Sequence, residues 1–504
     1  MKNILEMLEY SAFSYSNKTA VIDRDTELTY HGLMDGAQRV GSSLLDLKVC
    51  ACPIVIYLDK NADVILSMLG IVYSGNIYTV IETNTPVERI KKIFTTLCPA
   101  AVITDHTHYG QISELCSFVL FIEDIKRTSI DKNGLSSIRK KQIDTDAVYI
   151  LYTSGSTGIP KGTVINHRNI LSYSKWFVDA FDIGCNEVIA NQTPFCFSMS
   201  VTDIYSSLRS GATLLILPKI CFSFPYKLVE YLNNYKVTMI YWVPSAFGIV
   251  ANTNIFSTLK PIHLKKVLFA GEVMPVKYLN YWINHLDSSV VFANLFGPTE
   301  TTDICTYYII DRPFQNSDSL PIGRSCDNCN TFVINNDGKE AKENEEGELY
   351  VRGSFVSPGY YNNKEKTEKM FVQNPLNKSY PEICYKTGDI VKVGQNEELY
   401  YIGRKDFQIK RMGYRIELGE IESAVSSLYE TEESACIFDK LNNTLCVFYT
   451  SRTLDEKKLR SFLEQKLPKY FMPDIICRLK NMPHNQNSKI DRNELEKRLT
   501  ENYE

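Results

Sequence analysis

The chain has 504 residues, of which 44% are hydrophobic and 23% charged, and its formal net charge is −4. At about 150 residues per domain, this length predicts roughly three folded units, which can be fused into two larger bodies. The composition is that of a globular protein, which excludes a fibrous protein and wholesale disorder. No basic block is present, so the sequence also argues against nucleic-acid binding through a charged face.

Cysteine usage and hydropathy indicate a soluble cytoplasmic protein. The fourteen cysteines are scattered, and the only CxxC pair, Cys326 and Cys329, has no second pair or histidine pair near it. They are therefore interpreted as reduced thiols rather than metal or redox ligands. Residues 64–81 form an uncharged run, but serine, glycine and asparagine interrupt it. We predict a buried helix, a glycine turn and a strand there, and no membrane span.

The order of the predicted elements indicates an α/β fold. Short β-rich runs alternate with helical stretches over the first 400 residues, with strands expected at 101–104, 147–152, 213–217, 239–243, 266–269 and 290–293. This alternation is typical of parallel sheets covered by helices. We predict a large N-terminal body of α/β layers plus a small β-barrel from about residue 347, and a mobile, small α+β C-terminal domain with helices near 420–428 and 455–467. The expected domains are residues 1–404 and 405–504.

Residues 152–162, YTSGSTGIPKG, have the composition of an anion-binding loop. They follow the apolar run AVYIL and combine hydroxyls, glycines and a lysine. Glycines let the main chain approach an anion, while N–H groups, hydroxyls and an ammonium neutralise it. The loop is not a Walker A motif, because Lys161 is preceded by proline and followed by glycine.

Together with this loop, seven further motifs resemble those of the adenylate-forming enzymes, which include acyl-CoA synthetases, luciferases and peptide-synthetase adenylation domains. They are LTY at 28–30, NLFGPTE at 294–300, GELYVRG at 347–353, YKTGD at 385–389, GRKDFQIK at 403–410, GYRIELGE at 413–420 and NSKIDR at 487–492. Residues 195–205 (FCFSMSVTDIY), 271–272 (GE) and 406–410 (DFQIK) are most similar to D-alanine–carrier-protein ligases and stand-alone adenylation domains. The resemblance covers essentially the whole chain.

This resemblance implies an ATP-dependent, AMP-forming ligase that requires Mg²⁺. A carboxylate attacks the α-phosphorus of ATP, pyrophosphate leaves, and the acyl-adenylate then acylates a thiol. The first step gathers negative charge, so it needs cations and N–H donors more than a base. By position, the implied ATP-binding residues are Thr153, Ser154, Gly155, Thr157, Lys161, Asn294, Phe296, Gly297, Asp389, Tyr401 and Arg404.

The resemblance also implies catalytic and hinge residues. Thr299 would contact the α-phosphate, and Glu300 would hold Mg²⁺, for which a carboxylate is suited. Lys489 would bridge the acid and ATP in the first step. Asp406 stands at the family's hinge position, where the small domain would swing and bring residues 413–414 toward a thiol tunnel.

The acid pocket departs from the amino-acid-activating pattern. The aspartate that follows Phe197 in those relatives, and that pairs with the substrate α-ammonium, is Ser198. An unpaired buried ammonium costs several kcal/mol, so an ordinary α-amino acid is disfavoured. Compared with the D-alanine ligase, Ala270 replaces a cysteine and Asp303 replaces an apolar residue. The other pocket positions are Met199, Thr202, Tyr241, Leu268, Gly271, Leu295 and Ile304.

Three interpretations of Asp303 follow. A hydroxybenzoate could donate its phenol hydrogen to Asp303, and the apolar lining with Tyr241 favours this flat aryl acid. An ω- or β-amino acid could instead place its ammonium there as an ion pair. Alternatively, Asp303 turns away to a backbone donor. D-alanine–carrier-protein ligase remains the alternative function if Ser198 is compensated elsewhere.

The thiol acceptor is expected to be a separate carrier protein with a phosphopantetheine arm, because no carrier-like serine motif is present. Coenzyme A is the alternative, and Pro358 favours it, since carrier-loading members usually have arginine there. Ser488, which replaces a glycine before Lys489, is a smaller departure. A nucleotide-binding protein without catalysis is a further alternative, but the retained Lys161, Glu300, Asp389, Arg404 and Lys489 argue against it.

Overall fold

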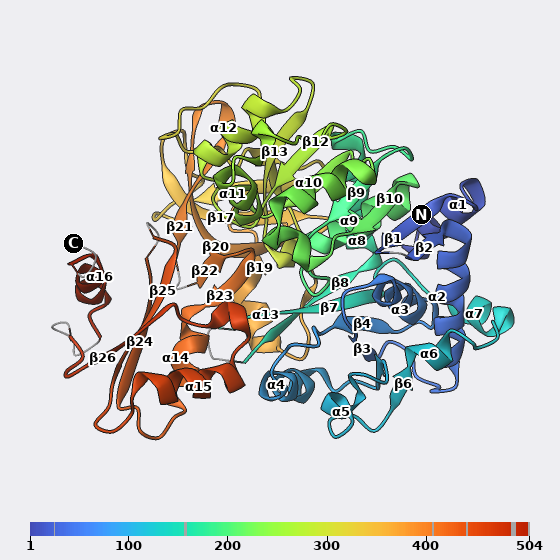
Figure 1. The fold of residues 1–504 in the computed structure, drawn as a ribbon, viewed down its shortest axis with the longest axis horizontal. Coiled ribbons are helices and arrows are strands. Elements are labelled where there is room, and N and C mark those ends of the chain that lie inside the picture. Colours follow the sequence, from blue (N-terminus) through green and yellow to red (C-terminus); the bar gives the residue numbers. More distant parts are fainter. Residues whose placement is uncertain (25, 156–158, 406–407, 440–441, 485–489, 502–504) are drawn as a thin grey trace. The chain divides into compact units, whose positions relative to one another are not determined.

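The computed structural model describes residues 1–24, 26–155, 159–405, 408–439, 442–484 and 490–501 (Figure 1). The chain divides into two compact units. Unit 1 comprises Met1–Thr83, Leu97–Leu151 and Gly162–Lys405, and unit 2 comprises Asn84–Thr96, Tyr152–Lys161 and Asp406–Glu504. The predicted domain boundary at 404–405 stays a prediction, and Asp406 lies outside the described residues.

Three sheets in the described chain carry the fold that the sequence predicts. The strand order of the nine-stranded sheet is β15 (Arg324–Ser325), β14 (Thr306–Ile309), β13 (Val291–Phe296), β12 (Lys266–Phe269), β11 (Met239–Trp242), β9 (Val188–Asn191), β10 (Thr213–Ile216), β1 (Thr19–Asp23) and β2 (Thr26–Thr29). That of the seven-stranded sheet is β18 (Gly359–Tyr360), β8 (Lys161–Asn166), β7 (Ala147–Thr153), β4 (Ile77–Val80), β3 (Pro53–Tyr57), β5 (Ala101–Thr104) and β6 (Val119–Phe121). The small β-barrel predicted from about residue 347 corresponds to an antiparallel sheet of β16 (Cys329–Ile334), β17 (Glu346–Gly353), β20 (Ile383–Val393), β19 (Phe371–Gln373) and β21 (Leu399–Arg404).

Helices connect the strands of unit 1, and the two larger sheets share one continuous hydrophobic core. The helices are α1 (Leu5–Ser14), α2 (Tyr30–Leu45), α3 (Ala62–Tyr73), α5 (Tyr109–Ile112), α6 (Ile122–Ile125), α7 (Lys132–Arg139), α8 (His167–Ala180), α9 (Met199–Ser210), α10 (Pro225–Asn234), α11 (Pro244–Asn252), α12 (Val276–His285) and α13 (Lys364–Met370). Single turns of 3₁₀ helix lie at η1 (Lys219–Ser223), η2 (Ile255–Ser257), η3 (Thr299–Thr301) and η4 (Gln395–Glu397).

Residues 64–81 confirm the prediction of a buried helix, a turn and a strand. The Asn61 side chain caps α3 by accepting from the main-chain N–H groups of Asp63 and Val64. Gly75 follows the helix with φ +75°, a left-handed conformation that favours glycine, and β4 begins two residues later. No described helix is long and apolar enough to span a bilayer.

The connectivity of the nine-stranded sheet indicates where a ligand is expected to bind. The chain passes from β9 through α9 to β10 on one side, and from β10 through α10 to β11 on the other side of β9. In open α/β sheets, ligands bind beyond the carboxyl ends of the strands at such a point of divergence. The segment that follows β9 leads to Phe197 and Ser198, and Tyr241 lies near the end of β11. The fold therefore brings two parts of the predicted acid pocket to this edge.

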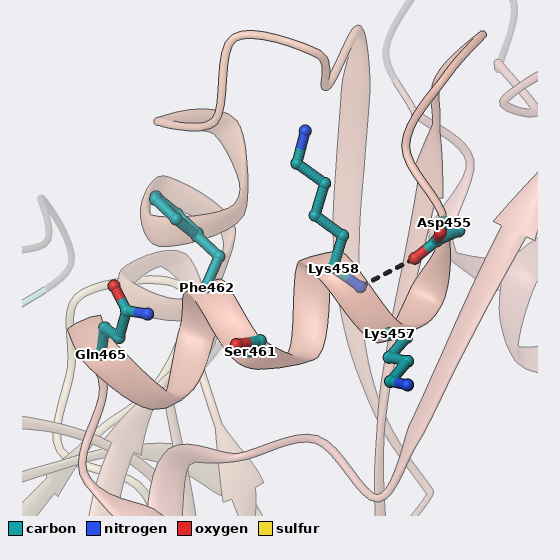
Figure 2. Close-up of a pocket in the computed structure, with 6 residues that line it drawn as sticks. All are labelled: Asp455, Lys457, Lys458, Ser461, Phe462 and Gln465. Carbon is teal, nitrogen blue, oxygen red and sulfur yellow. Dashed lines mark hydrogen bonds between the residues drawn. The ribbon is translucent and has the colours of Figure 1, made fainter.

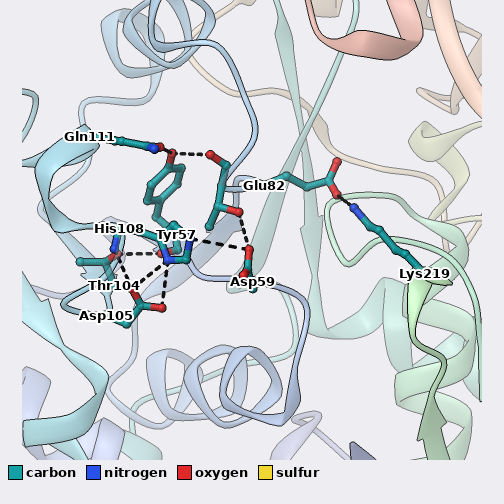
Figure 3. A network of polar contacts seen from close by, with 9 residues as sticks. Tyr57, Asp59, Glu82, Thr104, Asp105, His108, Gln111 and Lys219 are labelled. Carbon is teal, nitrogen blue, oxygen red and sulfur yellow. Dashed lines mark hydrogen bonds and ion pairs between the residues drawn. The ribbon is translucent and has the colours of Figure 1, made fainter. Parts of the chain in front are cut away.

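The carboxyl ends of β3, β4 and β5 carry a polar network (Figure 3). The Tyr57 hydroxyl donates to Gln111 Oε1 and to the Thr83 carbonyl, at 2.5 and 2.8 Å. The His108 ring lies 2.8 Å from Asp105 and 3.8 Å from Asp59. These contacts join the loops after the three strands, and none of these residues belongs to the predicted site.

Unit 2 is a small α+β body. Its elements are α4 (Val87–Leu97), β22 (Gln408–Arg411), β23 (Tyr414–Glu417), α14 (Leu418–Ser426), β24 (Glu433–Asp439), β25 (Thr444–Thr450), α15 (Glu456–Lys466), η5 (Lys469–Phe471), β26 (Ile475–Leu479) and α16 (Arg492–Glu501). Its helices α14 and α15 confirm the two predicted from the sequence. Strands β24, β25 and β26 form one sheet and β22 pairs with β23.

A buried ion pair joins α4 to α14 inside unit 2. Arg89 and Glu420 are 7% and 3% exposed, and their side chains form an ion pair. The Arg89 guanidinium also lies 5.2 Å from the centre of the Phe471 ring. Burial raises the pKa of Glu420, and the charge of Arg89 opposes that rise. The pair thus holds three segments of unit 2 together.

Arg89→Met is expected to destabilise the protein by about 3–5 kcal/mol, because it leaves the Glu420 carboxyl buried without its cation. Urea unfolding monitored by circular dichroism measures this loss. The double variant Arg89→Met/Glu420→Gln should recover most of it, since no charge then remains buried. Equal losses in the single and double variants would contradict the assignment.

Candidate active site

The residues predicted to hold the adenine lie together in unit 1. Phe296, at the end of β13, is 7% exposed, and its ring centre lies 5.8 Å from that of Tyr401 in β21. Asn294, two residues earlier on the same strand, donates from Nδ2 to the Pro321 carbonyl at 2.8 Å. This bond fixes the amide beside the Phe296 ring. The two aromatic rings and the oriented amide can bind a flat heterocycle.

Asp389 and Arg404, predicted to bind the ribose, form a buried pair. They occupy opposite positions on β20 and β21, and Arg404 Nη1 lies 3.0 Å from Asp389 Oδ1. The same nitrogen donates to the Thr387 carbonyl at 2.9 Å, and the Asp389 N–H donates to Thr387 Oγ1. These contacts hold the carboxylate in one orientation. Such a fixed acceptor suits a pair of vicinal hydroxyls.

Glu300 is fully buried in the single-turn helix η3, beside Thr299. The Tyr360 hydroxyl donates to Glu300 Oε1 at 2.7 Å, and the Ser357 N–H donates to the Glu300 carbonyl. Tyr360 was not among the predicted site residues, although it belongs to the PGY run that follows the GELYVRG motif. The carboxylate oxygens of Glu300 fit a hard cation such as Mg²⁺.

Gly297 joins the nucleotide residues to the acid pocket. A Cβ at this position would lie 2.2 Å from the Asp303 carbonyl oxygen and 2.5 Å from the Ile304 Cα. Both are main-chain atoms that cannot rotate away, so only glycine fits. The close approach fixes the distance between Phe296 and Asp303.

Gly297→Ala is expected to lower kcat/KM for both ATP and the acid by roughly tenfold or more, since overpacking of this kind costs about 1–3 kcal/mol. Steady-state kinetics with each substrate varied in turn measures the effect. Gly184→Ala is the matched control, because no atom lies within 4 Å of a Cβ there. An effect on only one substrate would contradict the proposed link between the two sites.

The acid-pocket residues gather at the carboxyl ends of three adjacent strands. Tyr241 on β11 is opposite Leu268 on β12, and β12 pairs in turn with β13, which carries Leu295. All three side chains are buried. The other pocket residues that are buried are Met199, Thr202, Ala270, Asp303 and Ile304, whereas Phe197, Ser198 and Gly271 are partly exposed.

A ring of hydroxyls surrounds the Asp303 carboxylate. Thr202 and Tyr241 donate to Asp303 Oδ2 at 2.5 and 3.0 Å. The Tyr173 hydroxyl, from α8, lies 2.6 Å from Thr202 Oγ1 and 3.3 Å from the same carboxylate oxygen. Ser198, which accepts from Thr299 at 3.4 Å, is a further hydroxyl that lowers the pKa of this carboxyl. The partners of Asp303 are thus side-chain hydroxyls, and the alternative of a backbone donor is wrong.

Burial raises the pKa of the Asp303 carboxyl to about 6, and the hydroxyl donors oppose a larger rise. The carboxyl is therefore largely ionised at neutral pH. Burial and the charge of Asp303 raise the pKa of Tyr173 and Tyr241 well above 10, so both remain donors. No basic side chain in the described part of unit 1 forms an ion pair with Asp303. The pocket accordingly holds a negative charge that a ligand can neutralise.

The sequence motifs do not reveal the role of Tyr173, because it belongs to none of them. It lies on α8, more than a hundred residues before Asp303, and a tyrosine in an amphipathic helix is usually a core residue. Its hydroxyl position depends on the packing of α8 against α9, which carries Thr202. Only the tertiary structure reveals this contact.

The predicted phosphate loop belongs to unit 2. Thr153 Oγ1 is buried without a hydrogen-bond partner among the described residues, and Lys161 is 4% exposed. Ser154 Oγ donates to the Arg415 carbonyl at 2.8 Å. A Cβ at Gly155 would lie 2.0 Å from the Ile159 carbonyl oxygen, so the turn requires glycine. A buried hydroxyl without a partner fits a ligand that accepts hydrogen bonds, such as a phosphate.

Four predicted residues are not described by the structure, and the two surface pockets contain none of the predicted site residues. Thr157, Asp406, Ser488 and Lys489 lie outside the described residues. An open pocket of about 420 Å³ on α15 contains only residues outside the predicted site, namely Asp455, Lys457, Lys458, Ser461, Phe462 and Gln465 (Figure 2). A second pocket, of about 570 Å³, also lacks predicted site residues. Within the described ranges, no three Asp, Glu, His or Cys side chains form a metal site.

Comparison with known proteins identifies the family. Residues 8–361 match the model of the AMP-binding enzymes. The chain belongs to the AMP-binding enzyme family. The match confirms the resemblance to adenylate-forming enzymes that the motifs indicate.

Individual relatives support the same assignment. The chain is 30% identical over 520 residues to the D-alanine–D-alanyl carrier protein ligase of Bacillus cytotoxicus, covering 99% of both chains. It is 29% identical over 498 residues to bacitracin synthase 3 of Bacillus licheniformis, covering 97% of this chain but only 8% of that synthase. The structure of the Vibrio cholerae adenylation domain AlmE, in complex with glycyl-adenosine-5′-phosphate, superposes with a TM-score of 0.86 at 21% identity, over 99% of this chain and 98% of that one. This likeness confirms the predicted fold class.

Proposed function

We propose that the protein is an ATP-dependent ligase that converts a carboxylic acid to its acyl-adenylate and transfers the acyl group to a phosphopantetheine thiol of a separate carrier protein. Membership of the AMP-binding enzyme family and the 30% identity to a carrier-protein ligase support this activity. In the first step, a carboxylate oxygen bonds to the α-phosphorus and pyrophosphate leaves. In the second, the thiol sulfur bonds to the acyl carbon, AMP leaves, and the thiol proton is released.

The described residues would divide the work of binding ATP. Phe296, Tyr401 and Asn294 bind the adenine, and Asp389, oriented by Arg404, accepts the ribose hydroxyls. Thr153 and Lys161 neutralise the pyrophosphate end, while Thr299 contacts the α-phosphate. Mg²⁺, when bound, offsets phosphate charge, and Glu300 would hold it together with the nucleotide. Lys489 and Asp406 retain the roles predicted from the sequence, as cation and hinge.

We further propose that the substrate is a β- or ω-amino acid. The observation that supports it is the ionised, buried Asp303 carboxylate beside Ser198, the position from which the α-ammonium partner is missing. The hydroxyls that surround the carboxylate are neutral, so a substrate ammonium is the group that can balance its charge. This reverses the order favoured by the sequence, which placed a hydroxybenzoate first.

A hydroxybenzoate remains the second candidate, because Tyr241, Leu268 and Leu295 provide an apolar lining for a ring. Its phenol would donate to Asp303 without neutralising the charge. It therefore gains a hydrogen bond, but not the ion pair that an amino acid gains.

ATP–pyrophosphate exchange tests the proposal, with D- and L-alanine, β-alanine, γ-aminobutyrate, benzoate, salicylate and 4-hydroxybenzoate as the acids. We expect exchange with β-alanine or γ-aminobutyrate and little with the α-amino acids. Exchange confined to the aryl acids would support the second candidate. Strong exchange with D-alanine would refute the proposed substrate class and identify a D-alanine ligase. Equal acylation of coenzyme A and of a carrier protein would contradict the proposed acceptor.

A further inference from the structure

Lys60 connects the two large sheets of unit 1 at the entrance to the acid-pocket segment. It follows β3 of the seven-stranded sheet, whereas its partners lie at the last residue of β9 in the nine-stranded sheet and just after it. Lys60 Nζ donates to the carbonyls of Asn191 and Gln192 at 3.1 and 3.0 Å. It also lies 5.3 Å from the centre of the Phe195 ring. One ammonium thus contacts three positions of the segment that leads to Phe197 and Ser198.

Main-chain hydrogen bonds hold part of this segment, since the Leu217 N–H donates to the Asn191 carbonyl and the Phe197 N–H to the Pro194 carbonyl. Asn191 Oδ1, Gln192 Oε1 and Thr193 Oγ1 are buried without hydrogen-bond partners among the described residues. Asn191 Nδ2 donates to Asp203 Oδ2 at 2.8 Å, but the other oxygen of Asp203 has no partner in the described chain. These side-chain atoms therefore contribute little to positioning the segment. Lys60 is the cation that binds two of its main-chain carbonyls.

The charge of Lys60 is sensitive to pH near neutrality. Burial lowers its pKa to about 7, and the charge of Asp203 on α9 opposes this effect. The other charged groups that act on it are Lys219 in η1, Glu82 after β4 and Asp23 on β1. Lys219 and Glu82 form their own ion pair at 2.9 Å (Figure 3). None of these carboxylates forms a direct ion pair with Lys60. The Asn191 and Gln192 carbonyls and the Phe195 ring therefore provide most of the contacts of its ammonium group.

We propose that Lys60 is a positioning residue for the acid pocket: by binding the Asn191 and Gln192 carbonyls and the Phe195 ring, it fixes the segment that presents Phe197 and Ser198 to the carboxylic acid. It contacts neither the acid nor ATP. The inference rests on the proposed acid-activating function for its kinetic consequence, but its structural part does not depend on which acid binds.

Hydrogen exchange measured by mass spectrometry tests the structural part without a substrate. In Lys60→Met, the main-chain amides of residues 192–198 are expected to exchange at least tenfold faster than in the wild type, while those of β12 keep their wild-type rates. Lys60→Arg retains a cation and should remain within threefold of the wild type. Lys175→Met is the matched control, because Lys175 is an exposed lysine on α8 that pairs with Asp179. Unchanged exchange in Lys60→Met would overturn the proposal.

Kinetics tests the consequence, using the acid that the wild-type enzyme activates best. Lys60→Met should raise the KM for this acid about tenfold and leave the KM for ATP and kcat within threefold, and Lys60→Arg should restore the acid KM. In the wild type, kcat/KM for the acid should fall above pH 7 as Lys60 loses its charge, and Lys60→Arg should abolish this fall. Equal effects on ATP and the acid, or no rescue by arginine, would contradict positioning. Failure of every acid to support exchange would instead refute the proposed function, and the hydrogen-exchange result would still decide the role of Lys60.

Discussion

Asp303→Asn is expected to lower kcat/KM for a β- or ω-amino acid by roughly 100-fold or more while making the protein more stable than the wild type at pH 7. The substrate ammonium would lose its only proposed counter-charge, and breaking a buried ion pair by removing one partner costs about 3–5 kcal/mol. The asparagine oxygen can still accept from Thr202 and Tyr241, which donate to Asp303 Oδ2 in the wild type. The packing around residue 303 is therefore retained.

The effect on stability has the opposite sign to the effect on activity. The folded-state pKa of Asp303 is raised from 3.8 to about 6, so the native protein binds more protons than the unfolded chain between these pH values. The free energy of unfolding consequently falls as pH rises from about 4 to about 6, by about 3 kcal/mol for a shift of two pKa units. Asparagine does not ionise, so the variant avoids this cost at pH 7.

Pyrophosphate exchange from pH 5 to 9 and thermal unfolding measure the two effects. The wild-type kcat/KM should rise through pH 6 as Asp303 ionises, and this rise should disappear in the variant. Asp179→Asn on the exposed face of α8 is the control for loss of one negative charge. A variant that retains wild-type activity toward amino acids would contradict the proposed substrate class. A loss of about tenfold or less toward the acid that the enzyme activates would instead favour a hydroxybenzoate, since its phenol exchanges a charge-assisted hydrogen bond of about 1.5–3 kcal/mol for a neutral one of about 0.5–1.5 kcal/mol.

The sequence predicts the fold well because its information is local and periodic. The strands at Ala101–Thr104 and Lys266–Phe269 have the predicted bounds, since each is a short apolar run between breaks. Their parallel pairing with β3 and β11 agrees with the alternation of strands and helices. Strand β13 spans Val291–Phe296 and so ends three residues after the predicted strand at 290–293, because the start of the NLFGPTE motif is itself part of the strand.

The site could be predicted only where motifs carry it. The glycines at 155 and 297 were found because the motifs contain them, and the structure gives their steric reason. Tyr173 and Lys60 act through contacts with segments more than a hundred residues away in sequence. A single sequence holds no periodic or spacing signal for such pairs. The direction of the Asp303 carboxylate, left open by the sequence, also depends on side chains from three separate helices and strands.

Moving the carboxylate from position 303 to position 198 is expected to change the substrate class. In Ser198→Asp/Asp303→Asn, the new carboxylate stands where amino-acid-activating relatives pair the α-ammonium, while the amide at 303 still accepts from the surrounding hydroxyls. The variant should lose roughly 100-fold in kcat/KM for β-alanine or γ-aminobutyrate and gain measurable exchange with α-amino acids, because ion pairing in a buried site is worth about 3–5 kcal/mol to whichever ammonium is aligned with it.

The two single variants complete the cycle. Ser198→Asp alone places a second carboxyl close to Asp303, because the Ser198 hydroxyl already lowers the Asp303 pKa in the wild type, so the two groups share a proton and neither class of acid gains a full ion pair. Asp303→Asn alone lacks both charges. We therefore expect α-amino acid exchange to be strongest in the double variant. The gain in the double variant should exceed the sum of the gains in the two single variants. If Ser198→Asp alone activates α-amino acids as well as the double variant does, the two side chains do not share one binding site, and the substrate ammonium is recognised elsewhere in the pocket.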